Sequence, residues 1–307
     1  MSRIKIVISG IYYPMTMLKW FELALRRRED VEVFSVGPHT GTWIPWGGGM
    51  QLPAKYATPP DLSLPQDWIG FKPSAAAIAS RLPWTPDLWL QVDAGWHFGD
   101  KPKAGIVVHI GTDPHVLLKF YQPAKAYSDI CFGMQGPYME AKDVYLPYAA
   151  DPIWHAPMEG LPQEYDACLI GLHYPQRDRL VEYLLKMGLK VYYDLGPIFR
   201  EYQQLNCAAR VVLSWSSLED TPARVYEGML MGRALCANRT KDLTEQFVEG
   251  DHFLGFDDER EAGNQVQRLL ADDSLRTEMG QRAHRKVMAQ HLWDHRIISI
   301  LDTCKLI

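Results

Sequence analysis

The stretch LSWSSLEDTPARVYEGMLMG, residues 213–232, decides how the second half of this chain folds. An aliphatic run at 211–213 is typical of a buried strand, and the polar residues that follow it indicate a loop. Thr221 is a candidate N-cap, Pro222 suits the first helical position, and Gly232 stands where the helix would end. The stretch therefore predicts a strand, a loop and a helix in that order.

Two glutamates stand eight positions apart in this stretch, Glu219 on the expected loop and Glu227 on the expected helix. Arg224 falls in the first helical turn, where the helix dipole disfavours a cation unless an anion lies nearby. A bound phosphate would supply that anion, and backbone N–H groups at the same helix start would favour it, so we place Ser217, Thr221 and Arg224 in a candidate phosphate-binding set. The alternative is that the two glutamates share this spacing by chance and that Arg224 pairs with an acidic neighbour on the surface.

The composition is that of a folded, acidic protein. The chain has 307 residues, of which 47% are hydrophobic, so two domains can each bury a core. The net charge of -5 argues against a broad basic surface for nucleic acid, although a local basic groove remains open.

Cysteine usage and the N-terminus bear on the compartment. The five cysteines are odd in number and include no C-x-x-C pair, which is typical of reduced core residues. The N-terminus MSRIKIVISG has no signal-peptide profile, and no apolar stretch reaches membrane-spanning length. We therefore expect a soluble, cytoplasmic protein.

Strand-like and helix-like segments alternate along most of the chain. In the first half we expect strands at 4–9, 31–36, 88–92, 104–110, 130–132 and 144–146, and a helix at 15–28. In the second half we expect strands at 166–170, 190–193, 210–213 and 234–237, helices at 177–187 and 198–206, a segment near 240–248 and two terminal helices. A Pro-punctuated connector, YAADPIWHAPMEGLP, follows Pro147 and marks the expected boundary. This order predicts an α/β fold with two Rossmann-like domains, 1–150 and 151–290, facing a cleft.

Residues 37–86 interrupt this alternation, because they are rich in Gly, Pro and Trp. Long irregular insertions are usually functional loops or covers, and we interpret the triple glycine at 47–49 as part of a mobile loop. Six tryptophans lie between residues 43 and 96, namely Trp43, Trp46, Trp68, Trp84, Trp89 and Trp96. They indicate either an acceptor surface for sugars or bases, or the packing of this insertion.

Several segments carry a family resemblance. They are RVYEGMLMG at 224–232, HLWDHR at 291–296, DPH at 113–115, DICF at 129–132 and LPYAADPIWH at 146–155. Together they resemble GT-B glycosyltransferases, most closely the CgeB-like group, from about residue 87 onward. The resemblance implies a final helix, 291–307, that returns towards the N-terminal domain.

The resemblance also implies roles for the candidate residues. Glu227 would accept hydrogen bonds from the ribose hydroxyls of a nucleotide, and Arg224 would face its diphosphate. Glu219 matches the first glutamate of the E-x7-E motif of retaining GT-B enzymes, which contacts the transferred sugar. Arg177, shortly after the Gly171 loop that opens the second domain, is a second phosphate candidate, unless it is a solvated helix residue.

The first domain carries its own candidates in HIGTDPH, at His109, Asp113 and His115. The spacing is not a recognised zinc pattern, and a turn in which His115 bonds to backbone is a structural alternative. In the cleft-facing interpretation, Asp113 or His115 orients or deprotonates an acceptor hydroxyl.

Gly10, Tyr12 and Tyr13 follow the first expected strand, so they are placed to line the same cleft. The aromatic faces of the two tyrosines would stack on a sugar, and the alternative is ordinary loop packing.

The expected activity is transfer of a sugar from a nucleotide diphosphate donor, a UDP-sugar, to a hydroxyl of a carbohydrate, a protein or a modified base. No metal or cofactor is needed in this hypothesis, and the anomeric configuration would be retained if Glu219 has the role that its motif implies. Two alternatives stay open: a non-catalytic nucleotide-binding protein on the same scaffold, and a phage-type DNA-base glycosyltransferase. The second would contact DNA through Lys101 and Lys103, or through Arg26, Arg27 and Arg28.

Overall fold

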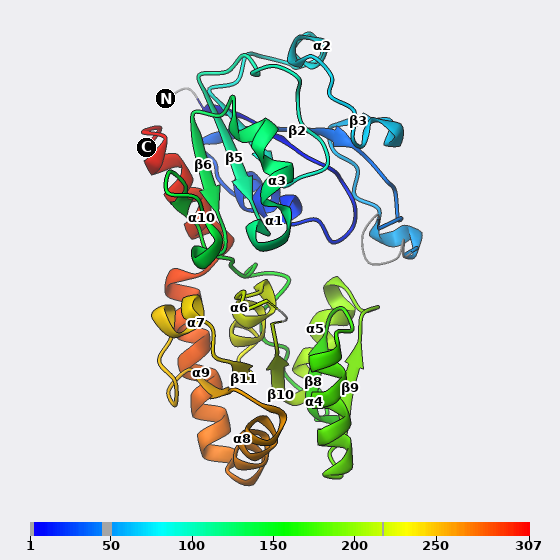
Figure 1. The fold of residues 1–307 in the computed structure, drawn as a ribbon, viewed down its shortest axis with the longest axis vertical. Coiled ribbons are helices and arrows are strands. Elements are labelled where there is room, and N and C mark those ends of the chain that lie inside the picture. The colour runs from blue at the N-terminus through cyan, green and yellow to red at the C-terminus, as the bar shows by residue number, and fades with distance from the viewer. Residues whose placement is uncertain (1–2, 45–50, 217) are drawn as a thin grey trace. The chain divides into compact units, whose positions relative to one another are not determined.

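The computed structural model describes residues 3–44, 51–216 and 218–307. The chain forms two compact units, each built on one parallel β-sheet (Figure 1). Unit 1 comprises Met1–Pro147 and Arg296–Ile307, and unit 2 comprises Tyr148–His295. The predicted α/β class with two Rossmann-like sheets is confirmed. The triple glycine at 47–49, Trp46 and Ser217 lie outside the described residues.

Unit 1 is a seven-stranded sheet in the order β3-β2-β1-β4-β5-β6-β7. Its strands are β1 (Ile4–Ser9), β2 (Val31–Pro38), β3 (Leu62–Leu64), β4 (Leu88–Val92), β5 (Ile106–Gly111), β6 (Ile130–Gly133) and β7 (Val144–Tyr145). Its helices are α1 (Leu18–Arg26), α2 (Ala75–Ala79) and α3 (Pro114–Lys125), with short 3₁₀ turns at Ala54–Tyr56, Gln66–Trp68 and Gly136–Tyr138. The chain builds outward from β1 in one direction and from β4 in the other, so the switch in strand order lies between these two strands.

The prediction that residues 37–86 are irregular is wrong in part. Strand β3 extends the sheet through its parallel pairing with β2, and Leu64 and Ile78 belong to the core of unit 1. Trp89 and Trp96 are fully buried in the same cluster, and the Trp89 Nε1 atom donates a hydrogen bond to Ser9 Oγ at 2.9 Å. These two tryptophans therefore pack the core, because their large apolar surface holds the insertion against the sheet.

Unit 2 is a five-stranded sheet in the order β12-β11-β10-β8-β9. Its strands are β8 (Tyr165–Ile170), β9 (Val191–Asp194), β10 (Ala209–Ser214), β11 (Ala234–Asn238) and β12 (Phe253–Phe256). Its helices are α4 (Pro175–Lys186), α5 (Phe199–Cys207), α6 (Ala223–Leu230), α7 (Lys241–Gln246), α8 (Glu259–Ala271) and α9 (Asp273–Gln290), and α10 (Trp293–Thr303) leads into unit 1. The switch in strand order lies between β8 and β10.

Strand β12 is absent from the predicted elements, and three described helices, α8, α9 and α10, follow it. Asp272 ends α8 and caps α9, since its side chain accepts a hydrogen bond from the Leu275 backbone N–H. One aspartate therefore divides an otherwise continuous helical pattern.

The side chains of the unit 2 strands alternate between two cores. Leu169 and Leu213 pack with α4 and α8, whereas Cys168 packs on the opposite face with residues of α5. Helix α6 approaches β10 closely at Gly228, where an added Cβ would lie 2.9 Å from Val212 Cγ1. This glycine therefore lets the helix that carries Arg224 and Glu227 sit directly on the central strand.

All five cysteines are free thiols, and four of them are buried. Among the described residues, no helix combines the length and apolar character needed to cross a membrane.

Candidate functional site

The candidate nucleotide site of unit 2 lies at the switch in strand order. Gly171 follows β8, and the loop after β10 leads into α6. In open α/β sheets, ligands bind outside the carboxyl ends of the strands at such a switch. The candidate residues from both loops are therefore gathered at the edge of the sheet where a ligand is expected.

Arg177 joins the two loops. It lies in the first turn of α4 and is only 4% exposed, which excludes the solvated alternative. Its Nε atom donates to the Trp215 carbonyl and its Nη1 atom to the Leu172 carbonyl, both at 2.7 Å, and its guanidinium lies over the Tyr174 ring. The side chain thus fixes the loop after β8 to the loop after β10.

Arg224 approaches the same point from α6. A Cβ added to Gly171 would lie 2.6 Å from Arg224 Nη2 and 3.4 Å from Arg177 Nη1, so both guanidinium groups converge on this glycine. Gly171 has a φ of +152°, which residues with a side chain rarely adopt. The Arg224 Nη1 atom is buried, and no acceptor among the described residues bonds to it.

Two converging cations are an arrangement that suits an anion. Burial, followed by the charge of Arg224, lowers the pKa of Arg177 to about 9, while Asp220 only partly offsets these effects. Arg177 therefore remains charged at neutral pH, and an anion between the two guanidinium groups would relieve their repulsion.

Glu227 lies one helical turn after Arg224 and is 8% exposed. Its Oε2 atom accepts a hydrogen bond from the Tyr202 hydroxyl at 2.6 Å, and its Oε1 atom lies 3.6 Å from His155 Nε2. Burial, followed by the charge of Glu227, raises the pKa of Tyr202 well above its usual value, so the hydroxyl stays a donor. The carboxylate is therefore held in one orientation from two sides.

Sequence reasoning missed Tyr202 and His155 as site residues. Tyr202 lies within an amphipathic helix, where its hydroxyl has no distinctive sequence signal. His155 does have a sequence signal, since it ends the LPYAADPIWH segment at 146–155, which runs into the connector. A lone histidine beside a domain boundary is therefore a feature that sequence analysis should weigh.

The predicted N-cap at Thr221 is wrong. Helix α6 begins at Ala223 with Pro222 as its N-cap, and the Thr221 hydroxyl pairs with that of Thr240 at 2.6 Å. Proline stands one position earlier than predicted because its extended backbone, with ψ of 159°, suits the residue before a helix. Thr221 thus ties the loop after β10 to the residue before α7.

Glu219 lies on the exposed part of the loop after β10, at a φ of +60°. Non-glycine residues rarely take this left-handed conformation, which often marks a functional turn. Its contact with a transferred sugar stays a prediction.

In unit 1, the HIGTDPH candidates separate onto two elements. His109 is 1% exposed within β5, where burial lowers its pKa to about 3, so it is a neutral core residue. Asp113 is the N-cap residue of α3 and is half-buried, without a side-chain capping bond, and His115 lies in the first turn. Asp113 and His115 therefore remain the candidates near the carboxyl end of β5.

Sequence reasoning also missed Asp93, which directly follows β4. It takes a φ of +66°, and its Oδ1 atom accepts a hydrogen bond from the Tyr121 hydroxyl at 2.9 Å. The same hydroxyl accepts the Asp113 backbone N–H at 2.9 Å. Burial, followed by the charge of Asp113, raises the pKa of Asp93 to about 6. A polar residue immediately after an apolar strand is the signal that would have found it.

The substitution Asp93→Asn is expected to stabilise unit 1 at pH 7.5 by roughly 2 kcal/mol. A carboxyl whose pKa is raised on folding favours the folded state when protonated, and this contribution is lost as pH rises from about 4 to about 6. Urea unfolding at pH 5 and pH 7.5 measures the effect, which should shrink at pH 5. The exposed Asp67→Asn change is the control, and equal effects of Asp93→Asn at both pH values would contradict the assignment.

Gly10 and Tyr13 follow β1. Gly10 is buried, and an added Cβ would lie 2.7 Å from the Val92 carbonyl oxygen, so this glycine permits close packing beside β4. Tyr13 packs partly against the core of unit 1, and Tyr12 is buried. Their contact with a sugar stays a prediction.

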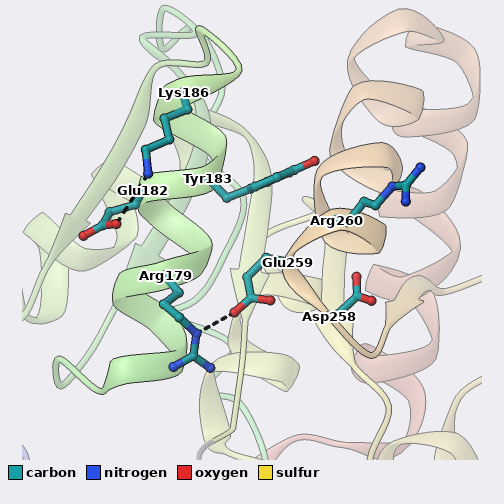
Figure 2. A pocket seen from close by; sticks show the side chains of 7 residues that line it. All are labelled: Arg179, Glu182, Tyr183, Lys186, Asp258, Glu259 and Arg260. Atoms are coloured by element: carbon teal, nitrogen blue, oxygen red, sulfur yellow. Dashed lines mark hydrogen bonds and ion pairs between the residues drawn. The ribbon is translucent and has the colours of Figure 1, made fainter.

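A surface recess lies elsewhere in unit 2, between α4 and the start of α8 (Figure 2). It is lined by Arg179, Glu182, Tyr183, Lys186, Asp258, Glu259 and Arg260. Arg179 Nε donates to Glu259 Oε1 at 2.8 Å, so charges of both signs already pair across it. Its balanced charge makes it unlike the site at Gly171.

The described parts of the chain contain no group of three or more His, Cys, Asp or Glu side chains suited to hold a metal ion. Among the candidate DNA contacts, Lys101 pairs with Asp129, and Arg26 and Arg28 pair with carboxylates at 2.5 to 2.7 Å. These cations are already neutralised within unit 1.

Comparison with known proteins places this geometry in context. Residues 152–302 match a family model described as glycosyl transferase-like. The chain carries a glycosyl transferase-like domain. This domain coincides with unit 2 and most of α10, and therefore holds Arg177, Arg224 and Glu227.

Solved structures share the fold along nearly the whole chain. A sucrose-phosphate synthase from Thermosynechococcus elongatus has 13% identity and a TM-score of 0.64, covering 99% of each chain. HepE from Anabaena, solved with UDP-glucose, has 10% identity and a TM-score of 0.64, covering 99% of this chain and 100% of its own. AviGT4, a glycosyltransferase involved in avilamycin A biosynthesis, has 14% identity and a TM-score of 0.59, covering 98% and 96%. No curated protein matches the sequence.

The family match and the shared fold agree with each other. The match over unit 2 and the GT-B fold shared with these structures support an enzyme of the glycosyltransferase class. The glycosyl transferase-like domain thus contains the converging arginines and the oriented glutamate.

Proposed function

We propose that this glycosyltransferase takes a sugar from a UDP-sugar bound by unit 2 and transfers it to a hydroxyl acceptor, without a metal ion, as a member of the CgeB-like group. The observation that carries the proposal is the convergence of Arg177 and Arg224 on Gly171, with Glu227 one helical turn further along α6. Residues three positions apart lie on the same side of a helix. One extended ligand with an anionic part and a hydroxyl-bearing part suits this pattern.

The donor assignment follows from the chemistry of each group. The two arginines bind the diphosphate, since guanidinium groups form strong charge-assisted hydrogen bonds to phosphate oxygens. Glu227 binds the ribose, because a carboxylate only accepts hydrogen bonds and a ribose offers two neighbouring hydroxyl donors. UDP is the preferred nucleotide because HepE, a structure of the same fold, was solved with UDP and with UDP-glucose.

The same residues supply the catalytic electrostatics. When the bond between the anomeric carbon and the diphosphate oxygen breaks, negative charge develops on the diphosphate, and Arg177 and Arg224 stabilise it. These fixed charges take the part that a divalent cation plays in other phosphate sites. Glu219 contacts the transferred sugar in this proposal, in keeping with a reaction that retains configuration.

On the acceptor side, the proposal uses the carboxyl ends of β4 and β5 in unit 1. Asp113 and His115, together with Asp93, are the groups that orient the acceptor hydroxyl and accept its proton. A carboxylate with the raised pKa of Asp93 is a stronger base than an ordinary aspartate. Gly10 and Tyr13 line the acceptor site beside them.

A thermal-unfolding screen tests the proposal, because a ligand that binds only the folded state raises its stability. UDP and UDP-glucose in the presence of EDTA are expected to raise the unfolding temperature. Uridine at the same concentration is expected to have little effect, since it lacks the diphosphate. If neither nucleotide raises the unfolding temperature, or if each does so only with added metal, the proposed donor site is wrong.

A further inference from the structure

Glu227 is held by residues from two other segments, Tyr202 of α5 and His155 of the connector. The Tyr202 hydroxyl donates to Oε2 at 2.6 Å, and His155 Nε2 lies 3.6 Å from Oε1. The two aromatic rings also meet edge to face, with centroids 6.0 Å apart. Both carboxylate oxygens are thus covered on one side.

The proton on His155 is located by its other nitrogen. His155 Nδ1 accepts a hydrogen bond from the Asp151 backbone N–H at 2.9 Å, so Nδ1 carries no proton. Burial lowers the pKa of His155, although the charges of Glu227 and Asp151 oppose this, and the ring is therefore neutral. Its single proton is on Nε2 and faces Glu227 Oε1.

This arrangement limits what Glu227 can bind. A carboxylate has about four acceptor positions, and here the Tyr202 hydroxyl occupies one and the His155 N–H faces another. The remaining positions suit two donors that approach together, as the two neighbouring hydroxyls of a ribose do. A 2′-deoxyribose offers only one, which leaves a buried acceptor without a partner.

We propose that Tyr202 and His155 are positioning residues that orient Glu227 towards a vicinal diol, and that the donor site thereby selects ribonucleoside over 2′-deoxyribonucleoside diphosphates. The inference rests on the proposed function, because it takes Glu227 as the ribose ligand. Without the Tyr202 hydroxyl, the carboxylate rotates and the advantage of the second ribose hydroxyl is lost.

Calorimetric titration of the full chain with UDP and with 2′-deoxy-UDP tests the inference. Wild-type protein is expected to prefer UDP about tenfold, in line with one unsatisfied buried acceptor. Tyr202→Phe is expected to reduce the preference to less than about threefold, mainly by weakening UDP binding. Tyr183→Phe, which removes a hydroxyl from the α4 surface, is the matched control and should keep the wild-type preference.

The outcomes separate this inference from the proposed function. If wild-type protein binds both nucleotides equally, or if Tyr202→Phe keeps the full preference, the positioning role is wrong while UDP binding stands. If UDP does not bind at all, the proposed function fails and the inference fails with it. The ¹⁵N chemical shifts of His155 give a second readout that needs no variant, and a proton on Nδ1 instead of Nε2 would also overturn the inference.

Discussion

Replacing Glu227 by alanine is expected to weaken UDP binding about 100-fold while the chain stays folded. Hydrogen bonds to a charged group contribute about 1.5–3 kcal/mol each. The loss of the two ribose hydrogen bonds, each at the lower end of this range, removes about 3 kcal/mol of binding free energy. The carboxylate is nearly buried and already oriented by Tyr202, so little entropy is spent in placing it on binding. Isothermal titration calorimetry with UDP measures the change.

The variant should stay folded because two effects on stability oppose each other. Removing Glu227 leaves the Tyr202 hydroxyl without its acceptor, which costs about 1–3 kcal/mol. It also removes a charge from a site that is only 8% exposed, and burying a charge is itself unfavourable. Far-ultraviolet circular dichroism and the unfolding temperature check that the fold is retained.

Glu219→Ala is the matched control, because Glu219 is the other glutamate of the E-x7-E pair and lies exposed on the loop. Since UDP lacks the sugar that would be transferred, this control should bind UDP as the wild type does. An unchanged UDP dissociation constant for Glu227→Ala would overturn the ribose assignment, whatever the control shows.

Local signals predicted the elements around the site well. The strand at 210–213, the loop after it and the helix that carries Glu227 are all present, because a buried aliphatic run followed by polar residues and proline acts over a few positions. The N-cap of this helix is Pro222 instead of Thr221, so the predicted position differs by one residue. Local chemistry thus placed Arg224 and Glu227 on the correct helix.

The surroundings of these residues could not be predicted in the same way. Tyr202 and Glu227 are 25 positions apart in sequence, and Asp93 and Tyr121 are 28 apart, so only tertiary packing brings each pair together. The burial of Arg177 also depends on carbonyl acceptors from two separate loops. A periodic pattern shows which face of a helix is apolar, but it does not show which side chain of another element packs against that face.

Replacing Arg224 by methionine is expected to remove most of the affinity for the diphosphate without destabilising the free protein. Its Nη1 atom is buried without an acceptor among the described residues, so no protein hydrogen bond is lost at that atom. The charge of Arg224 is also one of the causes that lower the pKa of Arg177. Its removal therefore relieves a repulsion between the two guanidinium groups in the free protein.

We expect UDP affinity to fall roughly 50-fold in Arg224→Met, since a charge-assisted contact to phosphate contributes about 1.5–3 kcal/mol. Arg224→Lys is expected to recover only part of this loss, because an ammonium lacks the planar fork that binds two phosphate oxygens. The surface substitution Arg179→Met is the matched control for loss of one positive charge in the same unit. Titration with UDP, together with the unfolding temperature of each free variant, separates binding from stability.

Arg177 should behave differently from Arg224, although both face the same glycine. Its side chain also holds the Trp215 and Leu172 carbonyls, so Arg177→Met is expected to lower both the unfolding temperature and the UDP affinity. If Arg224→Met instead destabilises the free protein as much as Arg177→Met and leaves UDP affinity unchanged, Arg224 is a structural residue. Without a bound anion, the two guanidinium groups repel each other, so free Arg224→Met protein should be at least as stable as free wild-type protein. Only the stabilisation by UDP should be lost.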